Sequence, residues 1–162
     1  MNEVRQVDTG RRKFLEATGG MTLLGLLVAA GILKPGAARA ADWNKAAFDA
    51  RSMKDALDAL GAGTPAQATD VVITAPDIAE NGSVVPLSAT SNLPKTESIA
   101  FLVDKNPNML AASFLLSEGS VPVVSTRVKL AETSNVSVLV KADGKFYVAT
   151  KEIKVTLGGC GG

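Results

Sequence analysis

The sequence predicts a mainly β protein, in which one N-terminal helix precedes an immunoglobulin-like antiparallel β-sandwich and a flexible glycine-rich arm follows it. Three observations predict this fold class. Seven short runs rich in β-branched residues, separated by turn residues, lie between residues 71 and 156. The dipeptide Asp143-Gly144 joins the last two runs in the manner of a tight hairpin. No helical periodicity follows residue 65, so the sequence offers no crossover helices for a parallel sheet.

The composition limits both the size of the domain and its chemistry. A chain of 162 residues, 46% of them hydrophobic, has room for one globular domain and a short appendage. The absence of His and the presence of a single Cys exclude Cys/His zinc sites, haem ligation by His and every catalytic set that needs a His base. The net charge is +1 and there is no basic block, so we expect no nucleic-acid binding.

The first 40 residues have the three-part organisation of an export signal. Arg11 and Arg12 stand before Phe14-Leu15, an apolar run covers residues 21–33, and small residues surround Ala40. The paired arginines followed by Phe-Leu resemble the twin-arginine signal. A membrane anchor is the alternative, but a helix that spans a bilayer needs about 20 apolar residues, and this run has 13. We therefore expect cleavage after Ala40, export to the periplasm and no stable membrane insertion of the mature chain.

The precursor therefore has three predicted parts. Residues 1–40 are the signal, residues 41–157 hold the helix and the sandwich, and residues 158–162 form the arm. The mature chain then has 122 residues with 11 basic and 13 acidic side chains, which gives a formal charge of −2. The slight basicity of the precursor therefore belongs to the signal.

The first element after the signal is predicted to be one helix from Trp43 to Leu60. Its apolar residues recur at spacings of three and four; they are Trp43, Ala46, Ala50, Met53, Leu57 and Leu60. Asp42 is a suitable N-cap, and Gly61 can adopt the left-handed conformation that ends a helix. The opposite side carries mixed charges, so we expect the apolar stripe to pack on the core rather than on a membrane or a partner helix.

Strands are predicted for the rest of the domain, after a Gly-Ala-Gly-Thr-Pro linker at residues 61–65. The expected strands are Val71 to Thr74, Val84 to Ala89, Ser98 to Val103, Ala111 to Leu116, Val121 to Leu130, Val136 to Ala142 and Lys145 to Thr156. Val136, Val138 and Val140 alternate with polar Ser137 and Lys141, which predicts one buried face. Both central residues of the Asp143-Gly144 turn can take positive φ, as a type I′ turn requires.

The only thiol of the chain lies in the C-terminal arm, where Cys160 stands between Gly158-Gly159 and Gly161-Gly162. Glycine lacks a Cβ, so this is a very flexible tether that leaves the sulfur accessible. Nothing near Cys160 in the sequence would lower its pKa, and a solvated thiol is only about 3% thiolate at pH 7. A partner enzyme would therefore have to activate the Cys160 thiol. This is typical of a carrier protein, which holds a covalently attached group and moves it between the active sites of other enzymes.

Two other functions remain for this thiol. An unpaired Cys in an exported protein often forms an intermolecular disulfide, so the chain could be a structural sandwich that dimerises through Cys160. A thiol enzyme in its own right is the less favoured alternative, because neither a His nor a neighbouring cation is there to activate the sulfur. On residue chemistry alone, the carrier and the crosslinked dimer stand about equal.

With these residues considered, the whole chain resembles SoxY, the sulfur-carrying subunit of bacterial thiosulfate oxidation. The most specific marks are the twin-arginine signal and the terminal Gly-Gly-Cys-Gly-Gly. Weaker marks are the early helix and the segments Thr74 to Gly82, Asn106-Pro107-Asn108, Ser125-Thr126-Arg127 and Asp143-Gly144-Lys145. Met109 stands where the family pattern leads us to expect a second Pro.

The resemblance implies a non-catalytic carrier that pairs with a β-rich SoxZ subunit and has no cofactor other than sulfur intermediates bound to Cys160. A c-type cytochrome would couple thiosulfate oxidatively to the thiol, a metal-dependent hydrolase would release sulfate, and a sulfane dehydrogenase or related enzymes would process the remaining sulfur.

Three further residues have two interpretations each. Glu80 and Asn81, followed by Gly82, either contribute to a partner surface or simply form a turn, as Asn-Gly sequences commonly do. Arg127 lies on a predicted strand, where it either pairs with a carboxylate or lines a docking face for anionic cargo. Residue chemistry does not decide between these roles.

Overall fold

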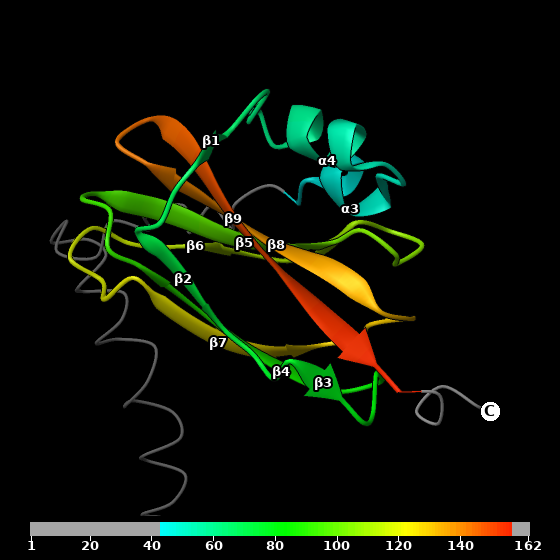
Figure 1. Ribbon diagram of the computed structural model, residues 1–162. Coiled ribbons are helices and arrows are strands. Elements are labelled where there is room, and N and C mark those ends of the chain that lie inside the picture. Colours follow the sequence, from blue (N-terminus) through cyan, green and yellow to red (C-terminus); the bar gives the residue numbers. More distant parts are fainter. Residues whose placement is uncertain (1–42, 157–162) are drawn as a thin grey trace, which may run out of the picture. The chain divides into compact units, whose positions relative to one another are not determined.

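The computed structural model describes residues 43–156, which form two β-sheets with two short helices over one of them (Figure 1). The larger sheet has the order β1-β9-β8-β5-β6, and β3 also pairs with β9. Its strands are β1 (Ala66–Gln67), β3 (Ile78–Ala79), β5 (Thr96–Val103), β6 (Leu110–Leu115), β8 (Ser134–Ala142) and β9 (Lys145–Val155). The smaller sheet has the order β2-β4-β7, with β2 (Val71–Thr74), β4 (Val85–Ser91) and β7 (Val123–Val128).

The seven predicted strands are confirmed, and their ends differ from the predicted ones by at most two residues. All pairs among them are antiparallel. The antiparallel sandwich is therefore confirmed for the predicted strands, whereas the two-residue strands β1 and β3 were not predicted and pair in parallel with β9. The crossover argument applies to consecutive strands of one sheet. These two-residue strands meet β9 from far along the chain, so no crossover helix is needed.

The predicted hairpin between β8 and β9 is confirmed. Asp143 has φ 48° and Gly144 has φ 74°, as a type I′ turn requires. Lys95 pairs with the Asp143 carboxylate at 2.9 Å, and the N–H of Gly144 donates to Glu97 Oε1 at 2.8 Å. The start of β5 and the residue before it therefore hold the tip of the hairpin in place.

The predicted helix over residues 43–60 is instead two short helices, α3 (Lys45–Asp49) and α4 (Met53–Ala59). Between them Ala50 and Ser52 have extended backbone. The Ala50 carbonyl accepts from the N–H of Met109 at 2.9 Å, while Ser52 Oγ caps α4 by accepting from the N–H of Asp55 at 3.1 Å. A tertiary hydrogen bond and a second cap thus interrupt the helix.

The break also changes which residues of the predicted stripe are buried. Ala50 is buried as expected, but Trp43 and Ala46 are exposed, and Ala47 is buried instead. Trp43 stacks on Phe48, with ring centroids 4.1 Å apart. Asn44, not Asp42, caps α3, whereas the predicted role of Gly61 at the end of α4 is confirmed by its φ of 72°.

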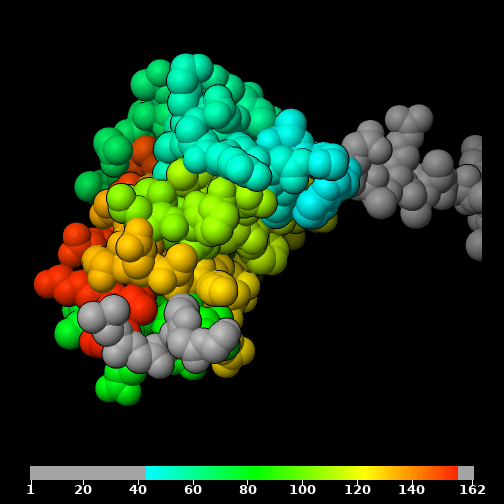
Figure 2. All heavy atoms as spheres, turned by 90° about the vertical axis from the view of Figure 1, so that its right-hand side faces the viewer, coloured from blue at the N-terminus to red at the C-terminus, as the bar shows by residue number. Residues whose placement is uncertain are grey.

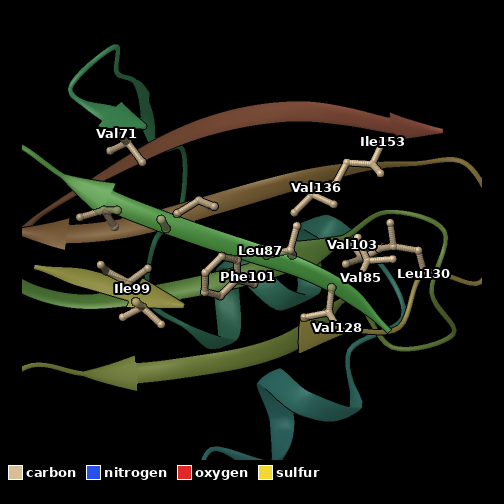
Figure 3. Packing of buried hydrophobic residues seen from close by; sticks show 14 of the residues in the cluster. Val71, Val85, Leu87, Ile99, Phe101, Val103, Val128, Leu130, Val136 and Ile153 are labelled. Atoms are coloured by element: carbon tan, nitrogen blue, oxygen red, sulfur yellow. The ribbon is translucent and has the colours of Figure 1, made fainter. Parts of the chain in front are cut away.

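The main core lies between the two sheets, where side chains from both point into one space (Figure 3). Val136, Val138 and Val140 of β8 are all fully buried there, as predicted, but Ser137 and Leu139 on the other face of the strand are buried too, so β8 does not have the single buried face that the alternation predicted. Phe101 of β5 is also fully buried and meets Phe114 edge to face. Burial of this apolar surface supplies the main stabilisation of the sandwich.

A second cluster lies under the helices, on the outer face of the larger sheet. Ala47 and Ala56 of the helices pack over Leu102, Leu139 and Val148 of the sheet. The space-filling view shows the helical segment, in cyan, directly against the yellow-green residues around β6 (Figure 2). The larger sheet is therefore covered on both faces, which explains why the burial of β5 does not alternate.

Candidate functional site: the base of the C-terminal arm

The predicted site residue Cys160 lies outside the described residues, as do Gly158, Gly159, Gly161 and Gly162 of the arm and Arg11 and Arg12 of the signal. The structure does describe the point from which the arm departs. Thr156, the last described residue, stands four positions before the cysteine and directly after β9. We call residues 153–156 the base of the arm.

Hydrogen bonds hold the base of the arm on both edges of β9. The N–H groups of Lys154 and Thr156 donate to the carbonyls of Asp77 and Ala79, at 3.0 and 3.1 Å, on the β3 side. The N–H of Val155, between them, points to the β8 side and donates to Thr133 Oγ1 at 3.0 Å. The backbone is thus tied to its neighbours up to the last described residue.

A buried side chain also anchors the base of the arm. Ile153 has no exposed surface and belongs to the main core. In Figure 3 it lies beside Val136 of β8. Moving the end of β9 would therefore expose apolar surface as well as break the backbone hydrogen bonds.

Lys151 joins β9 to the segment that leads into β3. Its Nζ donates to the carbonyl of Ala75 at 2.7 Å and pairs with Oδ1 of Asp77 at 2.9 Å. The hydrogen bond from Lys151, together with its positive charge, lowers the pKa of the Asp77 carboxyl. The pair therefore stays charged at neutral pH and fastens this segment along the edge of β9.

The loop after β3 contains Glu80 and Asn81, and both side chains are exposed. Asn81 Oδ1 accepts from the N–H of Ser83 at 2.9 Å, which is the turn geometry that the sequence allowed. The carbonyl of Gly82 accepts from the N–H of Leu130 at 2.7 Å. This loop directly follows Ala79, the partner of Val155, so the structure brings Asn81 and Glu80 near the base of the arm.

Arg127 lies elsewhere, on β7 of the smaller sheet, opposite Pro86 of β4. Its side chain is exposed and forms none of the ion pairs found among residues 43–156. The structure therefore does not support pairing with a carboxylate in this part of the chain. The other interpretation, a docking face for anionic cargo, stays a prediction.

The described part of the chain has few buried polar residues and no cluster of metal-ligating side chains. Within residues 43–156 no three His, Cys, Asp or Glu side chains come together as a metal site. The buried polar residues there are three serines, Ser91, Ser134 and Ser137. In the same range, no helix has the length and apolar character needed to cross a membrane.

Sequence reasoning missed the residues that hold the base of the arm, namely Asp77, Thr133 and Lys151. Lys151 and Ala75 are 76 positions apart, and β3 is too short to give a periodic signal. The sequence predicted β9 as a strand, but a strand pattern does not name the neighbours of the strand.

A family model described as "Sulfur oxidation protein SoxY" matches residues 56–160, a range that ends at the cysteine of the arm. The solved structure of the sulfur carrier protein SoxY from Chlorobium limicola f thiosulfatophilum is 36% identical. The match covers 64% of this chain and 96% of that one, with a TM-score of 0.56.

Two superoxide reductase (neelaredoxin) structures from Ignicoccus hospitalis also match, each at 16% identity. The match to the first covers 53% of this chain and 79% of that one, with a TM-score of 0.47. The match to the second covers 53% of this chain and 80% of that one, with a TM-score of 0.45. Curated proteins give no match.

A β-sandwich that leads into a cysteine-bearing arm, together with the two SoxY matches, defines a sulfur-carrier protein of sulfur oxidation. The chain belongs to the SoxY family.

Proposed function

We propose that this chain holds sulfur intermediates covalently on Cys160 and presents them to the enzymes of the Sox system. One observation carries the proposal. The only cysteine of the chain lies between two pairs of glycines, five positions beyond the end of β9, and the end of that strand is held at both edges. A carrier needs this combination of a firm base and a tether without bulky side chains.

The length of the arm fits entry into a narrow cleft. Cys160 stands four positions after Thr156, and an extended chain covers about 3.3–3.6 Å per residue. The thiol can therefore extend about 13–14 Å from the sandwich. Glycine flanks keep the width of the arm close to that of the backbone.

The loading step requires an external oxidant, which we assign to a c-type cytochrome. The Cys160 thiolate and the sulfane sulfur of thiosulfate would form one S–S bond, and the two electrons released would pass one at a time to that enzyme, whose haem groups would supply the oxidant. A water molecule, activated by a sulfate-releasing hydrolase, then cleaves the bond to the sulfonate sulfur. Sulfate and two protons leave, and a persulfide anion remains on Cys160 for a sulfane dehydrogenase.

The carrier itself catalyses none of these steps in our proposal. The chain contains no His, and no buried acid or base lies among residues 43–156. We propose the periplasm as the location, on the basis of Arg11 and Arg12 in the N-terminal segment, and a β-rich SoxZ-like subunit as the partner in a heterodimer.

Substitution of Cys160 by Ser tests the proposal. We expect cells with C160S to lose thiosulfate-dependent respiration, while the circular dichroism and the melting temperature of the protein stay unchanged. The control is C160S combined with Ser117→Cys, which puts a thiol on an exposed loop of the sandwich. That variant should not restore respiration, because its thiol has no arm. Normal respiration with C160S would overturn the proposal.

A crosslinked dimer is the competing outcome. Non-reducing electrophoresis of periplasm trapped with an alkylating reagent distinguishes the two. A carrier runs mainly as a monomer or as a complex with its partner, whereas a structural crosslinker runs mainly as a covalent dimer that C160S abolishes.

A further inference from the structure

The outer face of the smaller sheet differs in chemistry from the other surfaces of the sandwich. The helices cover the larger sheet, and no described element covers this face. Its outward side chains are small, hydroxylated or apolar, with one charged exception; they are Val72, Thr74, Pro86, Ser88, Thr90, Val123, Ser125 and Arg127. Arg127 is the exception. It is an exposed cation on a face without a carboxylate.

A hollow of about 350 Å³ lies beside Arg127 on this face. Thr74, Ser88 and Ser125 line it as a row, because Thr74 is opposite Ser88 in the β2–β4 register and Ser88 is opposite Ser125 in the β4–β7 register. Pro76 and Pro86 also line the hollow, and none of its lining residues is acidic.

The row of Thr74, Ser88 and Ser125 has hydroxyl donors that form no hydrogen bond within the described residues. The hydroxyls of Ser88 and Ser125 lie 2.9 Å apart. One of them donates to the other, so one O–H of the pair is left to donate outward. The Thr74 hydroxyl and the Arg127 guanidinium have no hydrogen-bond partner among residues 43–156. Two hydroxyl donors and a guanidinium fork therefore face the hollow.

The acid that follows the lining residue Pro76 does not neutralise Arg127. Asp77 follows Pro76 directly, but its carboxylate is paired with Lys151 at 2.9 Å. A second cation, Lys129, lies two residues beyond Arg127 and lines a neighbouring hollow of about 510 Å³ together with it. The local charge is therefore positive, which favours an anion.

We propose that this hollow binds a small tetrahedral oxyanion, such as sulfate or thiosulfate, without a covalent bond. The Arg127 guanidinium donates two parallel N–H hydrogen bonds to two oxygens of the ion, because the spacing of its N–H groups fits such a bidentate contact. The hydroxyl row supplies donors to a third oxygen. This site lies beyond the proposed carrier function and does not involve Cys160. Because it is open to solvent, we expect a dissociation constant on the order of 1 mM.

The test uses the full chain with C160S, so that no thiol chemistry contributes. Sodium sulfate and sodium thiosulfate are titrated against sodium chloride of equal ionic strength, and amide and Arg Nε–H shifts are followed by NMR. We expect saturable shifts at Ser88, Ser125 and Arg127 with the two sulfur oxyanions and not with chloride. Shifts that never saturate, or that chloride reproduces, would overturn the proposal.

Two variants that each lose one positive charge show whether Arg127 contacts the oxyanion directly or only adds to the positive potential of the surface. R127Q should weaken oxyanion binding at least about tenfold, whereas K129Q should weaken it less than about twofold. Equal losses would mean that general positive potential attracts the ion, and the site would be rejected. Acetate serves as the planar comparison, and acetate binding as tight as that of sulfate would assign the surface to a carboxylate instead. Because every sample lacks the Cys160 thiol, these outcomes are independent of the carrier proposal.

Discussion

Lys151 Nζ lies 2.9 Å from Oδ1 of Asp77, so one side chain of the last strand holds the segment that leads into its short parallel neighbour. The same Nζ donates to the carbonyl of Ala75. β3 has only two residues, and a strand of that length would not hold its place by backbone pairing alone. The Lys151–Asp77 pair is therefore part of what fixes the end of β9.

The first prediction concerns pH. Lys151 lowers the pKa of Asp77 below its ordinary value of 3.8, so the charged form is favoured in the folded state. The resulting stability is fully present above pH 3.8 and is lost as the pH falls through the lower, folded-state pKa. The stability difference between the wild type and Asp77→Asn should therefore be constant from pH 7 to pH 5 and shrink toward zero in more acidic solution.

Urea unfolding curves taken at a series of pH values measure this difference. Other carboxylates, such as Glu97 and Asp143, also have lowered pKa values, but their effect is common to both proteins and cancels. Glu118→Gln, in an exposed loop, is the control. A difference between wild type and Asp77→Asn that grows in acid would contradict the structural assignment.

The second prediction concerns Lys151 itself. Replacing it with Met keeps an apolar stem and removes both contacts, so the amides of Lys154 and Thr156 should lose their β3 partners more often. We expect their hydrogen exchange to accelerate about tenfold, with little change at Val138 in the core. Lys154→Met is the matched control, because Lys154 is exposed and its side chain takes part in no ion pair of the described residues. Equal acceleration in both variants would remove the special role of Lys151.

The third prediction tests the core between the sheets. Phe101 is fully buried and contacts Phe114, so Phe101→Ala should lower the free energy of unfolding by about 3–5 kcal/mol. Leu115→Ala on the neighbouring strand is the comparison, because Leu115 is 68% exposed; its effect should stay within about 0.5 kcal/mol. Urea unfolding measures both. Similar values for the two would mean that Phe101 is not in the core.

The fourth prediction concerns the flexibility of the arm. Gly159→Pro fixes one φ angle next to the cysteine without removing the thiol. Under the carrier proposal, the rate of thiosulfate oxidation should fall at least about tenfold, because the sulfur no longer reaches the reacting geometry in each partner. The melting temperature should not change. A full rate with Gly159→Pro would show that the arm needs no freedom at this position.

Local signals predicted much of this fold. The Asp143-Gly144 turn is a matter of backbone sterics, and both residues have the positive φ that the sequence required. The alternation of Val136, Val138 and Val140 predicted their burial because it depends only on the period of a strand.

Tertiary contacts decided what the sequence did not reveal. The helix break at Ala50 depends on a hydrogen bond from Met109, and spacing within the helix carries no information about that partner. The parallel pairing of Ile78 with Lys154 likewise joins residues far apart in the chain. Ser52 three residues before Asp55 was a readable cap, but the apolar periodicity across it favoured one continuous helix.

The site residues were likewise predicted only where local sequence was sufficient. The arm and Cys160 were evident from composition and position, whereas the base of the arm was not, because Thr133 and Lys151 act through contacts across the sheet. Arg127 was noted as a motif residue, and only the strand register placed it beside the hydroxyl row.

The most direct test of the carrier role is the mass of the C-terminal peptide. The protein is isolated without reductant from cells that grow on thiosulfate, and the peptide that contains Cys160 is weighed before and after treatment with a reducing agent. We predict added sulfur or thiosulfonate on Cys160 that disappears on reduction. A peptide found only as the free thiol, or only as a symmetric disulfide, would contradict the proposal that this chain carries sulfur on its arm.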